Sequence, residues 1–194
     1  MGSEMCIRDS SSPIRGWQTT ASDQMVEIWQ SGFIGVPAAL GSGYFAELNA
    51  NEQATLFQVV QLNAAGPVGF SLAHRGRDGI DVMDLVVYDL GNATGWSEGQ
   101  GVVVYSQRIS DANTNWGYYG SANAFTATLG HYYAFTCASI SSSGGYVNRG
   151  NLLDNVQFGN GLTIPAVPEP ATYGLALGDL ALVVVAVRRR AKRV

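Results

Sequence analysis

Short runs of alternating apolar and polar residues, separated by glycine-rich breaks, constrain the fold of this chain most strongly. Side chains of a strand point alternately to its two faces, so in residues 25–30 Val26 and Ile28 share one face. Eight such runs cover residues 25–30, 55–62, 68–73, 82–88, 102–106, 125–129, 132–140 and 152–158. No ten-residue segment between them has a helical period. The pattern predicts an all-β, antiparallel jelly-roll β-sandwich over residues 11–160.

Composition supports this fold class and excludes others. The chain has 24 glycines, and breaks such as 63–67, 91–100 and 141–145 contain the Gly, Asn, Ser and Pro residues typical of turns. Hydrophobic residues make up 46% and charged residues only 13%, which excludes a disordered chain and a coiled coil. Residues 1–166 hold six basic and 13 acidic residues and no lysine. A nucleic-acid partner is therefore not expected.

The first residues have an unusual sequence. Residues 5–10 read MCIRDS and resemble a translated sequencing adapter. The resemblance implies that residues 1–10 are an artefact and that the natural N-terminus, with any signal peptide, lies upstream. A natural polar N-terminus is the alternative. Only Cys137 then remains of the two cysteines, and its apolar surroundings predict a buried thiol rather than a disulfide.

Five segments of the predicted sandwich also resemble a family. They are residues 16–23, 27–33, 45–50, 74–79 and 150–156. In this order they resemble the galactose-binding-like jelly-roll modules of bacterial surface proteins, which are related in fold to carbohydrate-binding modules. The resemblance implies the jelly-roll fold. For function it leaves sugar binding, adhesion and a spacer role open, because one fold hosts many functions.

The C-terminal residues form a separate unit after a linker at residues 161–166. Residues 171–187 are an apolar run of the minimum length that crosses a bilayer as a helix, so we expect a single C-terminal transmembrane helix. The basic residues behind it predict a cytoplasmic end and a domain outside the cytoplasm. Asp179 in the middle costs about 2.5–3.5 kcal/mol on insertion, which suits a temporary anchor. A core or amphipathic helix is the alternative, but the run has no polar stripe.

This tail resembles the PEP-CTERM sorting signal, which is also known as the C-terminal domain of ice-binding proteins. The resemblance covers residues 167–194 and rests on a motif, a span and a basic cluster in that order. The motif is Val167, Pro168, Glu169 and Pro170, and the basic stop-transfer residues are Arg188, Arg189, Arg190, Lys192 and Arg193. It implies export, transient anchoring in the inner membrane and processing by an exosortase in a Gram-negative, exopolysaccharide-producing bacterium. The mature protein would then reside at the cell surface or in the extracellular matrix.

One glycine-flanked aromatic segment is the candidate ligand site. Asn115, Trp116, Tyr118 and Tyr119 lie in a break between predicted strands. Aromatic faces on loops stack against sugar rings, and amide side chains bond their hydroxyl groups. In the alternative interpretation, Trp116 seals one end of the core.

Two carboxylates are candidate calcium ligands. Glu47 and Asp154 fall near early and final strands, where related sandwiches hold a structural calcium ion, and calcium prefers such oxygen ligands. Alternatively, Glu47 caps a turn and Asp154 accepts hydrogen bonds from backbone amides. His74 with Asp78 or Asp81 forms the densest polar cluster, but no nucleophile motif accompanies it. We therefore expect no catalytic residues and no enzyme activity.

Three functions remain from the sequence. The first is an exported, exosortase-sorted surface or matrix protein whose sandwich binds extracellular polysaccharide. The second is a structural or adhesion protein of the matrix that binds no sugar. The third and most distant is a polysaccharide-active hydrolase, since paired carboxylates cannot be recognised from sequence.

Overall fold

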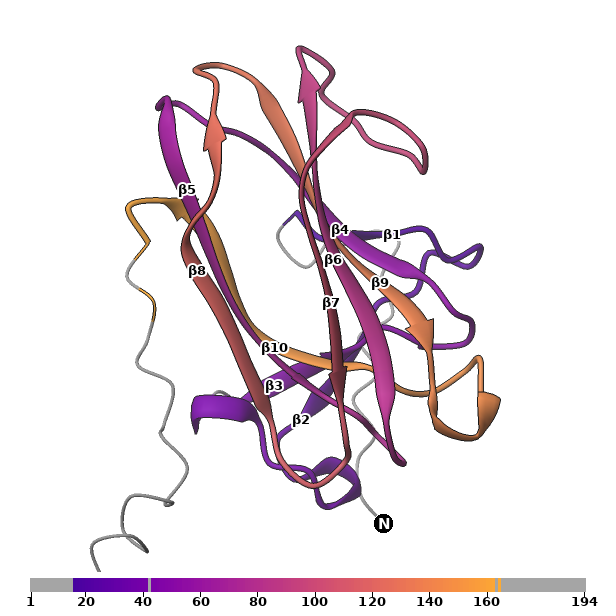
Figure 1. The fold of residues 1–194 in the computed structure, drawn as a ribbon. Coiled ribbons are helices and arrows are strands. Elements are labelled where there is room, and N and C mark those ends of the chain that lie inside the picture. The colour runs from indigo at the N-terminus through magenta and orange to yellow at the C-terminus, as the bar shows by residue number, and fades with distance from the viewer. Residues whose placement is uncertain (1–15, 42, 163, 165–194) are drawn as a thin grey trace, which may run out of the picture. The chain divides into compact units, whose positions relative to one another are not determined.

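The computed structural model describes residues 16–41, 43–162 and 164 (Figure 1). The chain divides into residues 1–164 and 165–194, and the description below concerns the first unit. Its strands are β1 (Gln18–Thr19), β2 (Glu27–Gln30), β3 (Tyr44–Glu47), β4 (Thr55–Gln61), β5 (Gly66–Arg75), β6 (Asp81–Gly91), β7 (Val102–Asp111), β8 (Gly117–Ala127), β9 (Tyr132–Ser141) and β10 (Leu152–Asn160). Three short 3-10 turns complete the described elements: η1 (Phe33–Gly35), η2 (Ala39–Gly41) and η3 (Ser143–Gly145).

The strands form two five-stranded sheets that face each other (Figure 1). The first sheet has the order β1-β4-β9-β6-β7 and the second the order β2-β3-β10-β5-β8. All strand pairs given for them are antiparallel. The final strand β10 lies between β3 and β5, with Leu152 opposite Glu47 on one side and Arg75 on the other. The predicted all-β antiparallel sandwich is confirmed.

The core lies between the two sheets. Met83, Leu85 and Cys137 point inward from the first sheet and meet Leu72 and Leu153 of the second. Each such buried aliphatic side chain contributes about 1.5–3 kcal/mol to folding. Burial also raises the pKa of the Cys137 thiol to about 12, so the thiol stays protonated and unreactive.

A second cluster covers the outer face of the second sheet. The chain between β2 and β3 folds back over this face and carries η1 and η2. It buries Val36 and Ala38 against Trp29, Phe45 and Leu152. Trp29, Phe45 and Leu152 are therefore buried on the face of the second sheet that points away from the first sheet.

A tryptophan lies on the outer face of the first sheet. Trp96 comes from the loop between β6 and β7, and its ring packs against Phe57 of β4 at 4.8 Å and Tyr88 of β6 at 5.5 Å between centroids. The Trp96 indole Nε1 donates to the carbonyl of Gln100 within the same loop. This loop is therefore anchored to the sheet.

Two features differ from the sequence-based prediction. Strand β3 was not anticipated, and β8 begins at Gly117 although only residues 125–129 were expected to be extended. Glycine-rich, weakly alternating segments are poor strand formers alone and are held here by pairing with neighbouring strands. The predicted transmembrane helix lies outside the described residues. Within the described part, no helix has the length and hydropathy needed to cross a membrane.

Candidate functional site

A cleft of about 520 Å³ lies between the two sheets, on the side of the edge strands β1 and β2. Leu56 of β4 contributes to the wall from the first sheet, and Leu153 of β10 contributes from the second. Trp17, immediately before β1, and Tyr44, at the start of β3, supply aromatic rings. The volume lies within the range of ligand pockets, about 300–1,000 Å³.

An irregularity in β10 shapes one wall of this cleft. The register between β10 and β5 shifts between Asp154 and Gln157, and Asn155 adopts a left-handed backbone with φ of 50°. Asparagine tolerates this conformation better than most residues. A bulge bends its strand and re-aims its side chains. Here it brings Asp154 and Asn155 into the lining of an otherwise apolar cleft.

Hydrogen bonds to η2 hold this wall in place. Asp154 Oδ2 accepts from the backbone N–H of Ala39 at 2.7 Å, and Oδ1 accepts from that of Asn155 at 2.7 Å. Asn155 Nδ2 donates to the Ala39 carbonyl at 3.0 Å. The interpretation of Asp154 as a residue that bonds backbone amides agrees with these contacts. The Asp154 carboxylate is thus held by backbone N–H groups of η2 and β10.

The aromatic rings of the cleft differ in exposure. Trp17 is half-buried and packs edge-on against Phe158, with 6.1 Å between ring centroids. Tyr44 is 47% exposed. The sequence analysis did not select either residue. The predicted ligand site rested on aromatic residues next to a polar turn, and this pattern does not show which surfaces meet across the sandwich.

The four residues of the sequence-predicted ligand site do not converge. Trp116 Nε1 donates to the Pro37 carbonyl at 2.8 Å, and its ring meets Phe45 edge-on at 5.8 Å. Trp116 therefore has a packing role, as in the alternative interpretation, but on the outer cluster of the second sheet rather than at an end of the core between the sheets. Asn115 is exposed at the turn before β8.

Tyr118 and Tyr119 lie on β8, not on a loop, so that part of the prediction is wrong. Tyr119 is opposite the core residue Leu72 and points inward, which places Tyr118 on the outer face. The Tyr119 hydroxyl donates to Asp111, with 2.9 Å to Oδ2. Burial, followed by this hydrogen bond and the charge of Asp111, raises the pKa of Tyr119 above its usual range. The two tyrosines therefore cannot stack against one sugar.

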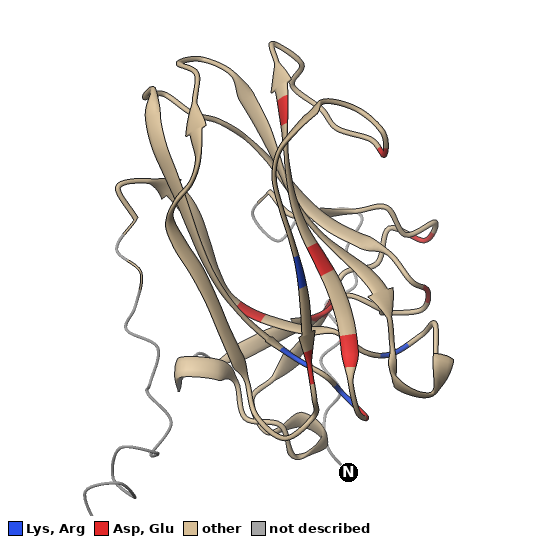
Figure 2. Ribbon diagram, in the orientation of Figure 1, with Lys and Arg blue, Asp and Glu red and all other residues tan. Residues whose placement is uncertain are grey.

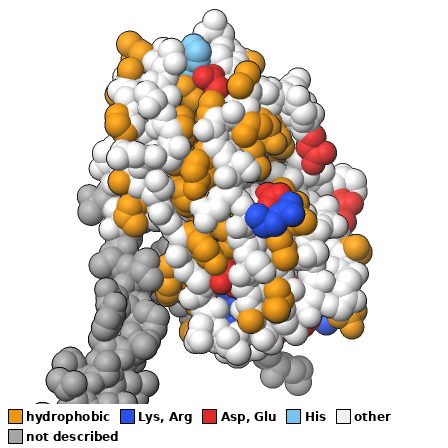
Figure 3. All heavy atoms as spheres, viewed as in Figure 1, with side chains coloured by type: hydrophobic (Ala, Val, Ile, Leu, Met, Phe, Trp, Pro, Cys, Tyr) orange, Lys and Arg blue, Asp and Glu red, His pale blue; other side chains and the backbone are white. Residues whose placement is uncertain are grey.

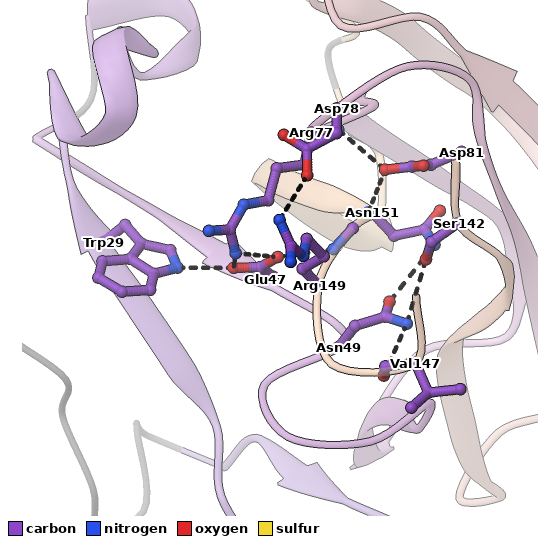
Figure 4. A network of polar contacts seen from close by, with 11 residues as sticks. Trp29, Glu47, Asn49, Arg77, Asp78, Asp81, Ser142, Val147, Arg149 and Asn151 are labelled. Carbon is purple, nitrogen blue, oxygen red and sulfur yellow. Dashed lines mark hydrogen bonds and ion pairs between the residues drawn. The ribbon is translucent and has the colours of Figure 1, made fainter. Parts of the chain in front are cut away.

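Glu47, the other proposed calcium ligand, is buried and surrounded by donors (Figure 4). Its oxygens accept from Trp29 Nε1 at 2.9 Å and from the Gly150 backbone N–H at 2.6 Å. Arg77 Nη1 lies 2.8 Å from both oxygens. Among the described residues, no group of three or more His, Cys, Asp or Glu side chains is arranged to hold a metal ion. Calcium binding by Glu47 and Asp154 stays a prediction.

A polar network next to Glu47 ties β10 to the rest of the sandwich (Figure 4). Asp81 accepts from the backbone N–H of Asn151 at 2.9 Å. The buried His74 lies between Asn151 Oδ1, at 3.0 Å from Nε2, and Asp111, at 2.8 Å from Nδ1. Both ring nitrogens therefore have protein partners, and we assign the cluster a structural role.

The sorting residues Val167 to Pro170 and the basic residues 188–190, 192 and 193 lie beyond the part of the chain that the structure describes. Their interpretation therefore rests on the sequence.

Comparisons with known proteins give structural likenesses only. No protein-family model matches the chain, and no curated protein does either. TmCBM61, solved with β-1,4-galactotriose, is similar at 14% identity and a TM-score of 0.48, over 74% of this chain and 88% of that one. The CBM22-2 xylan-binding domain from Paenibacillus barcinonensis Xyn10C is similar at 12% identity and a TM-score of 0.49, over 76% of this chain and 92% of that one.

Proposed function

We propose that the described domain is a non-catalytic module that binds polysaccharide in the cleft between its sheets. The observation that carries the proposal is the combination of two aromatic rings, Trp17 and Tyr44, with two polar side chains, Asp154 and Asn155, around one cleft of about 520 Å³. Sugar rings have apolar faces that pack on aromatic side chains. Their hydroxyl groups need fixed hydrogen-bonding partners.

The positions of these groups suit a rigid ligand site. The bond that Asp154 accepts from the Ala39 N–H and the bond that Asn155 donates to the Ala39 carbonyl hold the polar wall before a ligand arrives. A preformed wall lowers the entropy cost of binding. Tyr44 is exposed enough to offer its ring to a ligand.

The lining of the cleft supports binding without hydrolysis. Glycoside hydrolases act through two carboxyl groups on either side of the scissile bond. Among the described residues that line the cleft, Asp154 is the one carboxylate. A second catalytic carboxylate would therefore have to come from outside this lining. Both oxygens of Asp154 already accept backbone hydrogen bonds.

The proposal places this module in an exported protein. The order of Pro-Glu-Pro motif, apolar run and arginine cluster in residues 167–194 supports exosortase sorting through the inner membrane to the cell surface or matrix. A surface protein that binds polysaccharide would attach itself to the extracellular matrix.

The test compares variants of the full chain in affinity electrophoresis against soluble polysaccharides. Tyr44→Ala and Trp17→Ala should each weaken binding about tenfold, equivalent to about 1.4 kcal/mol. Tyr146→Ala is the matched control, because Tyr146 is also 47% exposed but does not line the cleft. Binding that is lost in Tyr118→Ala and retained in Tyr44→Ala would transfer the site to the outer face of β8. Absence of binding to every polymer would favour the structural matrix role.

A further inference from the structure

We propose that the cleft takes a neutral polysaccharide and that the domain excludes polymers carrying carboxylate or sulfate groups. This inference rests on the proposed function and specifies its ligand class. It is carried by the placement of every positive charge in the described part of the chain.

The described residues contain four arginines and no lysine. Three of the arginines form ion pairs with carboxylates. Arg77 pairs with Glu47 at 2.8 Å, and Arg149 pairs with Asp78 at 3.3 Å and also lies 4.0 Å from the ring centroid of Tyr146. These guanidinium groups are neutralised within the protein (Figure 4).

The third ion-paired arginine is Arg108, and the fourth arginine, Arg75, bonds a backbone carbonyl. Arg108 forms two parallel hydrogen bonds to Asp84, from Nε and Nη2, each of 2.8 Å. The face drawn in Figure 3 carries few blue basic side chains and several red acidic ones. Arg75 is half-buried and donates through Nη2 to the Asn113 carbonyl. None of the four arginines lines the cleft.

Recognition of a uronate or a sulfate ester ordinarily uses an arginine fork or a lysine that is free to face the anion. Among the described residues that line the cleft, none is a lysine or an arginine, and Asp154 is the one charged residue. A second carboxylate brought close to Asp154 would meet a like charge in a partly desolvated site. Like-charge contacts of this kind disfavour an acidic ligand relative to a neutral one.

The rest of the domain adds to this exclusion. The described part contains eleven Asp and Glu residues and four arginines, which gives a net charge of −7 with the histidines neutral. Figure 2 shows acidic residues on strands such as β6, β7 and β10 and in several loops. At physiological ionic strength this charge acts over about 8 Å, so the repulsion depends on salt. A polyanion would be repelled before it reaches the cleft.

The experiment uses polymer pairs that share a backbone and differ in charge. Hydroxyethyl cellulose is compared with carboxymethyl cellulose, dextran with dextran sulfate, and methyl-esterified with de-esterified polygalacturonate. Affinity electrophoresis of the full chain should show binding to at least one neutral member and about tenfold or weaker binding to its charged partner. The difference should shrink as salt is raised from 0.05 to about 0.5 M.

Two lysine variants test whether the local charge decides the selectivity. Tyr44→Lys replaces an aromatic ring of the cleft by a cation and should reduce the ratio of neutral to acidic polymer binding. Leu129→Lys adds the same charge at a position that is 63% exposed outside the cleft, and should leave the preference unchanged.

Tighter binding of an acidic polymer than of its neutral partner by the unmodified chain overturns the charge selectivity and leaves polysaccharide binding intact. An equal shift in both lysine variants overturns the role of the cleft in selectivity. Failure of every neutral and acidic polymer to bind overturns the proposed function itself, and the inference with it.

Discussion

Arg77 and Glu47 form an ion pair in which one guanidinium nitrogen lies 2.8 Å from both oxygens of a fully buried carboxylate. The pair joins β3 to the loop between β5 and β6, 30 residues away in sequence. Trp29 and Gly150 complete the set of donors to the same carboxylate. Segments from the beginning, the middle and the end of the domain therefore meet at Glu47.

We predict that Arg77→Ala lowers the free energy of unfolding by about 3–5 kcal/mol, because it leaves a buried charge without its partner. Arg108→Ala is the control: it removes an ion pair whose arginine side chain is 64% exposed, and should cost about 1 kcal/mol or less. Urea unfolding followed by tryptophan fluorescence measures both. Equal losses in the two variants would contradict the importance of burial.

Removing Asp154 should destabilise the domain and disturb the cleft. Asp154→Ala leaves the backbone N–H groups of Ala39 and Asn155 without this acceptor, which costs about 1–3 kcal/mol for a buried donor. We expect a lower melting midpoint and weaker polysaccharide binding. A variant with unchanged stability would show that the contact with η2 contributes nothing.

The same melts test the calcium hypothesis for Asp154 and Glu47. A ligand present at a hundredfold excess over its Kd stabilises the folded state by about 2.7 kcal/mol, a shift of several degrees. The unmodified chain should therefore have a higher melting midpoint in millimolar calcium than in chelator. Asp154→Ala should have the same midpoint in both. An unchanged wild-type midpoint would rule out the metal site.

A fourth prediction concerns the acid stability of the pair between Asp89 and His131. Burial acts to raise the pKa of Asp89, but hydrogen bonds from the Gly91 backbone N–H and from His131 outweigh it, so the pKa is lowered. A lowered carboxyl pKa stabilises the fold above the unfolded-state value of about 3.9, and this stability is lost as pH falls through the folded-state pKa.

Unfolding free energies measured from pH 7 to pH 2 should therefore fall less steeply in Asp89→Asn than in the unmodified chain. Asp78→Asn, which alters a more exposed pair, provides the comparison. Parallel pH profiles for all three proteins would contradict the assignment.

A fifth prediction concerns sorting and rests on the sequence of residues 167–194. In a host with the matching exosortase, the mature protein should lack the tail after processing near Pro168–Pro170. Glu169→Ala should leave uncleaved protein in the inner membrane. Intact mass spectrometry of surface protein decides the matter: retention of Arg188–Arg193 by the unmodified protein would count against processing.

Much of the fold was predictable from local patterns. The alternation in residues 82–88 and 132–140 predicted β6 and β9, because a strand with one buried face must repeat every two residues. The apolar setting of Cys137 predicted its burial. The weakly patterned strand β3 was missed because its residues become extended through pairing with β2 and β10.

The candidate site was harder to predict for a related reason. Tyr118 and Tyr119 are adjacent in sequence, yet strand geometry sends them to opposite faces of β8. Trp17 and Asp154 are far apart in sequence, yet they line one cleft. The β10 segment with the register shift places Asp154 and Asn155 in the lining of the cleft, and the residue types around it do not predict that shift.

The sequence by itself determined the all-β class, the antiparallel sandwich and the division between an acidic domain and a basic tail. These follow from the period of hydrophobicity and from charge, which are local properties of the chain. Only the tertiary structure decided that Glu47 pairs with Arg77, that Trp116 seals an outer cluster and that Trp17 and Tyr44 share a cleft with Asp154. The physical reason is that each of these contacts joins segments brought together by strand order and register, which depend on the packing of the whole sandwich.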